Sequence, residues 1–221
     1  MSKAAAVIVA AGRGVRAGGT EPKQWQSLLG RPVLAHTLAA FQSHPDIAQI
    51  VLVLHADDAG RADLYLDAQT IAVTGGSDRA TSAKHGLDAV TDASFVLIHD
   101  VARPLVTHKL ITRVIDALAG QSGAAPALAV TDALWTGSAG QVTGTMDRTG
   151  LYRAQTPQGF DLKSITDAHA AHPGGAADDV EVARAYGLDV SIVPGDEENI
   201  KITHAEDFAR AEQIMRGRDG H

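Results

Sequence analysis

The chain has 221 residues, of which 45% are apolar and only 4% aromatic, with no cysteine and a formal net charge of −7. This length and apolar share predict a single α/β domain over residues 1–221, with a core of small aliphatic side chains. The acidic balance disfavours nucleic acid or an anionic membrane as the main partner. The lack of cysteine excludes disulfides, thiol catalysis and thiolate metal sites. The N-terminal apolar run is too short for a membrane span, so we expect a first strand, no signal peptide and a cytoplasmic protein.

The stretch from Ala4 to Gln24 organises the rest of the chain. Residues 4–10 are apolar throughout, which favours a central parallel strand buried on both faces. This strand leads into a glycine-rich segment with three cations, among them Arg16 and Lys23. Glycine lets backbone N–H groups approach an anion closely, and the cations supply the counter-charge. The stretch therefore predicts a phosphate-binding loop.

Strands and helices alternate up to residue 130. Buried strands are predicted at 50–54, 71–73, 95–98 and 125–130. Helices are predicted to begin with Pro32 in the first turn, to span 57–68, and to follow N-caps at Ser77 and Thr107. This alternation predicts a Rossmann-like, doubly wound, mostly parallel sheet with right-handed crossovers.

The pattern changes at residues 131–150, which lack a helical stripe and contain a Gly-Ser-Ala-Gly turn. We expect a protruding β-arm that packs on another subunit in a homodimer, with a disordered excursion as the alternative. Beyond it, helices are predicted at 161–171, 178–186 and 205–215, and strands at 190–193 and 199–203.

The glycine-rich segment fits one kind of phosphate chemistry better than two others. Residues 12–17 formally match the dinucleotide-binding fingerprint, but two further glycines and Pro22 oppose the helix that this fingerprint requires. An NAD-dependent oxidoreductase is therefore disfavoured, and no Gly-Lys-Ser/Thr completes a P-loop. Arg16 and Lys23 lie where they could close over a triphosphate and neutralise charge on its α-phosphate and on departing pyrophosphate. Ordinary surface solvation is the alternative for this pair.

A second anchor is Asp100, which follows the strand predicted at 95–98. In doubly wound sheets the end of this strand commonly neighbours the end of the first strand, where ligands bind. A carboxylate there could hold Mg²⁺ between triphosphate oxygens, with water completing the shell. Capping of the turn at Arg103 is the alternative. His99 is expected to be a packed or surface histidine, and the spacing of the histidines gives zinc no support.

Taken together, these segments resemble the sugar-phosphate nucleotidyltransferases and, more narrowly, the 2-C-methyl-D-erythritol 4-phosphate cytidylyltransferase family of the non-mevalonate isoprenoid pathway. The first segment is V-A-A-G-R-G-x-R, followed by P-K-Q. The later ones are G-G-S-D-R-A-T-S (75–82), H-D-V-A-R-P (99–104), D-R (147–148), Q-T-P-Q-G-F (155–160) and N-I-K-I-T (199–203). The resemblance covers nearly the whole chain, and the order of the motifs makes it specific.

This resemblance implies a reaction in which the phosphate of methylerythritol phosphate attacks the α-phosphorus of CTP and pyrophosphate leaves. By matching position, Arg16 and Lys23 would stabilise the transition state. Asp100 would bind Mg²⁺ or substrate hydroxyls, and Lys201 would face the methylerythritol phosphate. Arg148 would reach the same phosphate from the arm of the partner subunit, which would make the homodimer the active form. The residues implied in nucleotide binding are Ala10, Ala11, Gly12, Gly76, Ser77 and Ser82, and Arg103 is implied in substrate binding by orienting its segment.

Two departures from the family pattern bear on the acceptor. Ala133 and Ala177 stand where the family has threonines, and Trp135 stands where a lysine is common. One lost neutral hydrogen bond costs about 1 kcal/mol, so we expect weaker acceptor binding and not an inactive enzyme. The alternative acceptor is another polyol phosphate, such as ribitol 5-phosphate. The alternative from another class is a non-catalytic nucleotide-binding module.

Overall fold

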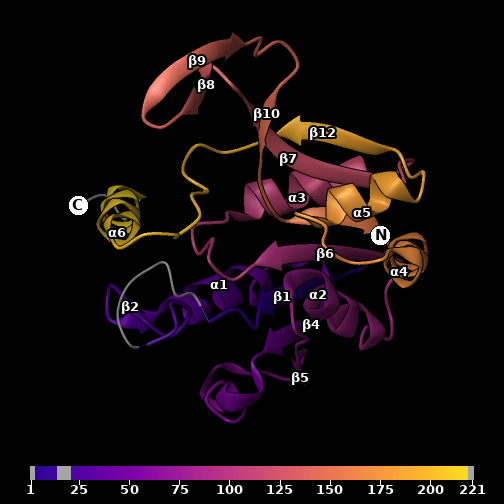
Figure 1. Ribbon diagram of the computed structural model, residues 1–221. Helices are drawn as coiled ribbons and strands as arrows, with labels where there is room; N and C mark the ends of the chain where they lie inside the picture. Colours follow the sequence, from indigo (N-terminus) through magenta and orange to yellow (C-terminus); the bar gives the residue numbers. More distant parts are fainter. Residues whose placement is uncertain (1–2, 14–20, 219–221) are drawn as a thin grey trace.

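The computed structural model describes residues 3–13 and 21–218, so the predicted catalytic residue Arg16 lies outside the described residues. An eight-stranded mixed sheet with helices on both faces forms the body of the molecule (Figure 1), which confirms the predicted α/β class. Its strands are β1 (Ala4–Ala10), β4 (Ile47–Leu54), β5 (Thr70–Thr74), β6 (Phe95–Asp100), β7 (Gly123–Ala129), β10 (Tyr152–Ala154), β11 (Gln158–Asp161) and β12 (Val190–Pro194). Their order is β10-β7-β11-β6-β1-β4-β5, and β12 also pairs with β7.

Strand β1 lies inside the sheet and pairs in parallel with β4 on one side and β6 on the other. Its side chains alternate between two cores: Ala6 and Ile8 belong to one, and Ala5 and Val7 to the other. This two-sided burial explains why the strand is apolar throughout. Because β1 and β6 are parallel neighbours, their carboxyl ends meet at one edge of the sheet, as the sequence predicted.

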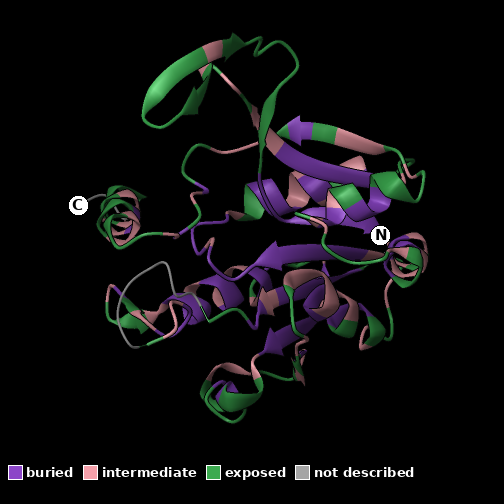
Figure 2. Ribbon diagram, in the orientation of Figure 1, coloured by how far each residue is buried: buried purple, intermediate pink, exposed green. Residues whose placement is uncertain are grey.

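The helices are α1 (Val33–Gln42), α2 (Arg79–Asp88), α3 (His108–Ala117), α4 (Leu162–Ala171), α5 (Asp179–Ala185) and α6 (Glu206–Arg218). Helices α1 and α3 share one core with the sheet, and α2, α4 and α5 share the other. Figure 2 shows the central strands buried between these layers. The close packing of α2 depends on Gly86, because a Cβ there would lie 2.4 Å from Val7 Cγ1. Helix α6 packs in a third cluster with Leu28 and Ile202.

The predicted arm is a β-hairpin of β8 (Leu134–Ser138) and β9 (Gln141–Met146). It protrudes from the body in Figure 1 and is largely exposed in Figure 2. Ala139 and Gly140 make its turn with φ angles of 50° and 79°. Its use in dimerisation stays a prediction.

The helix predicted at 57–68 is wrong. The chain instead makes two 3₁₀ turns, η2 (Ala56–Asp58) and η3 (Asp63–Tyr65). Gly60 lies between them with φ 80°, a left-handed conformation that interrupts a right-handed helix. This segment follows the carboxyl end of β4 and therefore lies at the same sheet edge as the end of β1.

Two further parts of the chain differ from the sequence prediction. Pro32 does not lie in the first helical turn: it is the N-cap of α1 and ends a short hairpin of β2 (Ser27–Leu28) and β3 (Arg31–Pro32). Residues 199–203 form no strand, and long-range side-chain bonds described below hold them in place. Across the described part of the chain, every helix is too short or too polar to cross a bilayer.

Candidate active site

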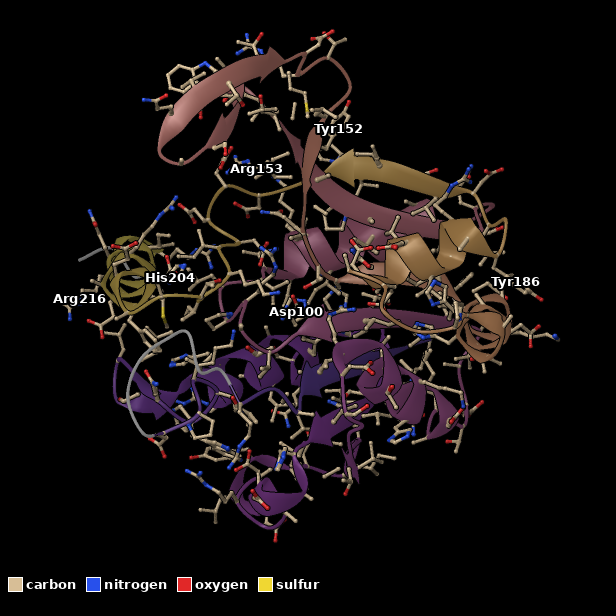
Figure 3. All side chains as sticks on the ribbon, in the orientation of Figure 1. Asp100, Tyr152, Arg153, Tyr186, His204 and Arg216 are labelled. Atoms are coloured by element: carbon tan, nitrogen blue, oxygen red, sulfur yellow. The ribbon has the colours of Figure 1, made fainter. Side chains whose placement is uncertain are left out.

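A cavity of about 220 Å³ opens at the carboxyl ends of β1 and β6. Figure 3 shows Asp100 at the end of β6, toward the middle of the molecule. The predicted site residues that line the cavity are Ala10, Ala11, Gly12, Lys23, Gly76, Ser77, Ser82, Asp100 and Lys201. The lining residues that the sequence did not assign to the site are Val9, Gln24, Asp78, Arg79, Val101 and Ala102. The structure thus brings most of the predicted residues together.

At Gly76 the wall of the cavity packs too closely against its neighbours to carry a side chain. A Cβ on Gly76 would lie 2.2 Å from Thr81 Cγ2, inside van der Waals contact. The Gly76 N–H donates to Ser82 Oγ at 3.1 Å, and this hydroxyl donates to the Asp78 carbonyl at 2.8 Å. Ser82 therefore fixes the conformation of this loop as well as lining the cavity.

Helix α2 begins at this wall, and its N-cap is Asp78, not Ser77 as the sequence predicted. The Asp78 carboxylate accepts from the Thr81 N–H at 2.8 Å. Hydrogen bonds from the Thr81 backbone and side chain lower the pKa of Asp78. Ser77 is therefore not the cap of α2, and it lines the cavity.

The charged centre of the cavity is Asp100, the last residue of β6. Its carboxylate oxygens lie 2.7 Å from Lys201 Nζ and 3.1 Å from Arg79 Nε. Burial alone would raise the pKa of Asp100, but the charges of Arg79 and Lys201 outweigh burial and hold this pKa well below its usual range. Asp100 is therefore ionised at neutral pH.

Arg79 connects this centre to a buried carboxylate behind it, and the sequence missed this link. Arg79 Nη2 lies 2.8 Å from Asp179 Oδ2, and the other oxygen of Asp179 lies 3.1 Å from His169 Nε2. Burial would raise the pKa of Asp179, but the His169 hydrogen bond and the Arg79 charge lower it. Arg79 lies in the motif 75–82 quoted above, and this motif is the sequence signal that could have identified it as a site residue. Nothing in the sequence identified Asp179 as its partner.

Lys201 lies on an irregular segment that is held by side chains from other elements. Arg103 Nη1 donates to the Asn199 carbonyl at 2.7 Å, and its Nη2 donates to the Ala154 carbonyl at 3.2 Å. Asn199 Nδ2 in turn donates to the Thr156 carbonyl at 2.9 Å. Arg103 is not among the lining residues of the cavity, and it supports the segment that places Lys201 there.

His99 is packed inside the protein, one of the two positions expected for it. Its ring nitrogens lie 3.0 Å from Thr156 Oγ1 and 3.2 Å from the Arg103 carbonyl. Burial lowers the pKa of His99 to about 3, so the ring is neutral at physiological pH. Thr156 Oγ1 also accepts from the Asp100 N–H at 3.1 Å, so this trio fixes the end of β6.

Lys23 and Gln24 form the opposite wall. Lys23 Nζ donates to the Ile202 carbonyl at 3.2 Å, next to Lys201. Gln24 Nε2 donates to the Ala10 carbonyl at 3.1 Å and thereby joins this wall to the end of β1. Two predicted catalytic lysines, far apart in the sequence, therefore approach the same part of the cavity.

Arg148 is, with Arg103, a described site residue that does not line the cavity. It is exposed after β9, and its Nη1 donates to the Thr131 carbonyl across the base of the arm. Its predicted action across a dimer interface stays a prediction.

Asp100 is suited to a divalent cation that is held mainly by substrate. Among the described residues, no group of three or more His, Cys, Asp or Glu side chains is arranged for a metal ion. Mg²⁺ beside a polyphosphate needs only one or two carboxylates, since phosphates and water supply the other oxygens. The donor set of the cavity therefore fits Mg²⁺ bound with a nucleotide.

The fold and cavity together define a nucleotide-binding α/β protein, in which close-packed glycine backbone and cationic side chains meet at the edge of a doubly wound sheet. Comparison with known proteins narrows this class. Residues 4–217 match the family described as 2-C-methyl-D-erythritol 4-phosphate cytidylyltransferase. The chain belongs to this family, and it is a nucleotidyltransferase.

Relatives and solved structures agree with this assignment. The chain is 60% identical over 223 residues to the 2-C-methyl-D-erythritol 4-phosphate cytidylyltransferase of Roseobacter denitrificans, covering 99% of this chain and 100% of the relative. It is 59% identical over 218 residues, 98% of its length, to a bifunctional enzyme IspD/IspF of Rhodobacter capsulatus, of which it spans 57%. The solved cytidylyltransferase of Thermus thermophilus is similar with a TM-score of 0.83 and 31% identity, covering 95% of this chain and 98% of that one.

Proposed function

We propose that this cavity binds CTP and transfers its cytidylyl group to 2-C-methyl-D-erythritol 4-phosphate, with pyrophosphate as the second product. The reaction belongs to non-mevalonate isoprenoid biosynthesis. The observation that carries this proposal is that Lys23 lines the same cavity as Asp100 and its partners Arg79 and Lys201, in a chain of this family. We propose the cytoplasm as its compartment, because CTP is a soluble metabolite there.

The backbone wall is the proposed nucleotide side of the cavity. Ala10, Ala11 and Gly12 leave the end of β1 here and face Gly76 and Ser77. We infer that the backbone groups of these residues bind the cytosine and ribose. Close backbone contacts to the base would favour a pyrimidine over the larger purine.

The side of the cavity that carries Lys23 and Lys201, here called the lysine wall, is the proposed site of the chemistry. An oxygen of the acceptor phosphate forms a bond to the α-phosphorus of CTP while the bond to the pyrophosphate oxygen breaks. Negative charge then builds on the leaving pyrophosphate and on the α-phosphoryl oxygens. Lys23, with Arg16 by resemblance, would neutralise this charge, and Lys201 would receive the acceptor phosphate. Lys201 can leave Asp100 for that phosphate because its side chain is partly exposed.

Asp100 is the residue that would hold Mg²⁺, or else the hydroxyls of the acceptor. The ion would supply charge neutralisation for the triphosphate. Arg79 in the cavity wall holds Asp100, and Arg103 behind the wall holds the Lys201 segment.

We also propose that the active form is a homodimer joined by the β8–β9 arm. The arm exposes large apolar side chains, among them Trp135 at 68% and Val142 at 58%, which a partner would cover. Arg148 at the base of the arm would then reach the acceptor phosphate of the partner subunit.

The second candidate acceptor is ribitol 5-phosphate. Ala177 directly precedes Asp178, the N-cap of α5, and Ala133 lies at the base of the arm. Both positions lack the threonine hydroxyl that the family pattern would place there. This observation is also the motive for a non-catalytic nucleotide-binding module.

Pyrophosphate release decides among these candidates. The protein is mixed with CTP, Mg²⁺ and either methylerythritol phosphate or ribitol 5-phosphate. We expect release with the first acceptor. Pyrophosphate release with ribitol 5-phosphate alone would make that compound the proposed acceptor. CTP binding in calorimetry, with no pyrophosphate released in the presence of either polyol phosphate, would support the non-catalytic module.

Replacing Lys23 by Ala tests the proposed chemistry of the lysine wall. We expect kcat to fall about 100-fold with little change in the Kd of CTP, because the lysine acts mainly on charge that develops in the transition state. Lys163→Ala is the matched control, since this lysine pairs with Asp167 on α4 and is 84% exposed. Equal losses in kcat and CTP affinity would contradict the proposed role of Lys23.

A further inference from the structure

The backbone that carries Lys23 is held from outside the cavity by the segment between β4 and β5. We call residues 55–66 the anchoring lobe; it contains η2 and η3 and forms the coil beside β5 in Figure 1. None of the described residues that line the cavity belongs to this lobe. Any effect of the anchoring lobe on the reaction must therefore pass through the residues that it contacts.

The first contact is made by Asp58, whose side chain is only 2% exposed. Its Oδ2 accepts from Gln24 Nε2 at 3.3 Å, and Gln24 itself is 1% exposed. Its Oδ1 lies 3.6 Å from Arg61 and 3.9 Å from Arg13. A buried carboxylate is tolerated only when cations and donors surround it, and here the donor is the residue next to Lys23.

The second contact is made by Arg61. Its Nη2 lies 2.7 Å from Glu21 Oε1, and its guanidinium stacks 4.4 Å above the ring of Trp25. The lobe thus contacts Glu21 before Lys23, and Gln24 and Trp25 after it. Trp25 is buried in the main core, so this side of the segment is fixed to the body of the protein.

We propose that Asp58 and Arg61 are positioning residues for Lys23. They hold residues 21–25 so that the Lys23 ammonium stays at the Ile202 carbonyl, next to Lys201. A lysine side chain has many rotamers, and a fixed backbone reduces the set that reaches the transferring phosphoryl group. The inference rests on the proposed transition-state role of Lys23.

Arg61→Gln tests this inference with little risk to folding, because the Arg61 side chain is 42% exposed. We expect kcat to fall about tenfold, while the Kd of CTP changes less than about twofold. Arg61→Lys keeps one charge for Glu21 but lacks the fork that reaches two carboxylates, so its kcat should fall between those of the wild type and Arg61→Gln. Arg184→Gln is the matched control. This exposed arginine lies in the last turn of α5 and pairs with Asp189 at 2.6 Å. It should leave kcat unchanged.

A double-mutant cycle shows whether Arg61 acts through Lys23. In the Lys23→Ala background, Arg61→Gln should lower kcat by less than about twofold, because the group that it positions is already gone. An equal tenfold loss in both backgrounds would overturn the inference. So would an unchanged kcat in Arg61→Gln, or weaker CTP binding with an unchanged kcat, which would make Arg61 a binding residue.

Failure of the underlying function has a different signature. If Lys23→Ala itself keeps the wild-type kcat, the proposed role of Lys23 is wrong whatever Arg61→Gln does. If Lys23→Ala is slow and Arg61→Gln is normal, only the positioning role fails.

Discussion

Replacing Asp179 by Asn should destabilise the protein through Arg79. Asp179 has no exposed surface, and its two oxygens lie close to Arg79 and His169. Asn keeps the volume and an oxygen for the His169 hydrogen bond, but it removes the charge that balances the guanidinium. Removing one partner of a buried ion pair costs about 3–5 kcal/mol. Because Arg79 keeps Asp100 at 3.1 Å, we expect the lower end of that range, about 3 kcal/mol.

Urea unfolding at neutral pH measures this loss, with the midpoint lowered and the slope m unchanged. Asp189→Asn is the matched control, because Asp189 also pairs with an arginine but is 90% exposed. Its loss should stay below about 0.5 kcal/mol. A loss below about 1 kcal/mol for Asp179→Asn, or one equal to the control, would refute the reasoning that a buried charge holds Arg79.

Two further outcomes follow from the geometry of the cavity. Gly76→Ala should weaken CTP binding about tenfold in calorimetry, since its Cβ would lie 2.2 Å from Thr81 Cγ2 and the loop must move. Gly217→Ala in α6, where a Cβ meets nothing within 4 Å, should leave CTP binding unchanged, and equal effects would disprove the close approach at Gly76. The pKa of His99 falls from 6.5 to about 3 on folding, so between these values the unfolded chain binds a proton that the folded chain does not. Stability should therefore fall as the pH drops below 6.5, by up to about 1.4 kcal/mol per pH unit from this group. His99→Gln should have a shallower pH dependence, and an unchanged slope would exclude His99 as its source.

The parallel part of the fold was predictable because a strand that is buried on both faces is apolar at every position in the sequence. Strand β1 is apolar at every position, and the bounds predicted for it are those observed. The helix predicted at 57–68 failed because Gly60 takes a positive φ, which side-chain periodicity does not report. Residues 199–203 alternate like a strand, with Ile202 buried against α6. Long-range side-chain bonds and a single backbone bond, from the Ile202 N–H to the Ala102 carbonyl, hold them in place of a strand ladder.

The candidate site was also predictable only in part, because motifs and strand topology can be read from the sequence and long-range pairings cannot. Lys23, Asp100 and Lys201 could be proposed from motifs, and Asp100 also from topology, since parallel strand ends converge at one edge. The pairing of Arg79 with Asp179 could not be proposed in this way. It depends on α2 and α5 packing on the same face of the sheet, which brings together residues from distant parts of the chain.

The acidic composition of the chain and its use of polyanionic substrates are compatible because carboxylates position the cations. Asp179 holds Arg79, Asp100 holds Arg79 and Lys201, and Asp58 holds the segment that carries Lys23. Two of these acids are nearly inaccessible to solvent, and Asp100 is the one that lines the cavity. The substrates would therefore meet cations already held in place, and the acceptor phosphate would compete with Asp100 for Lys201. The affinity lost to this competition is the cost of holding Lys201 in place before the acceptor arrives.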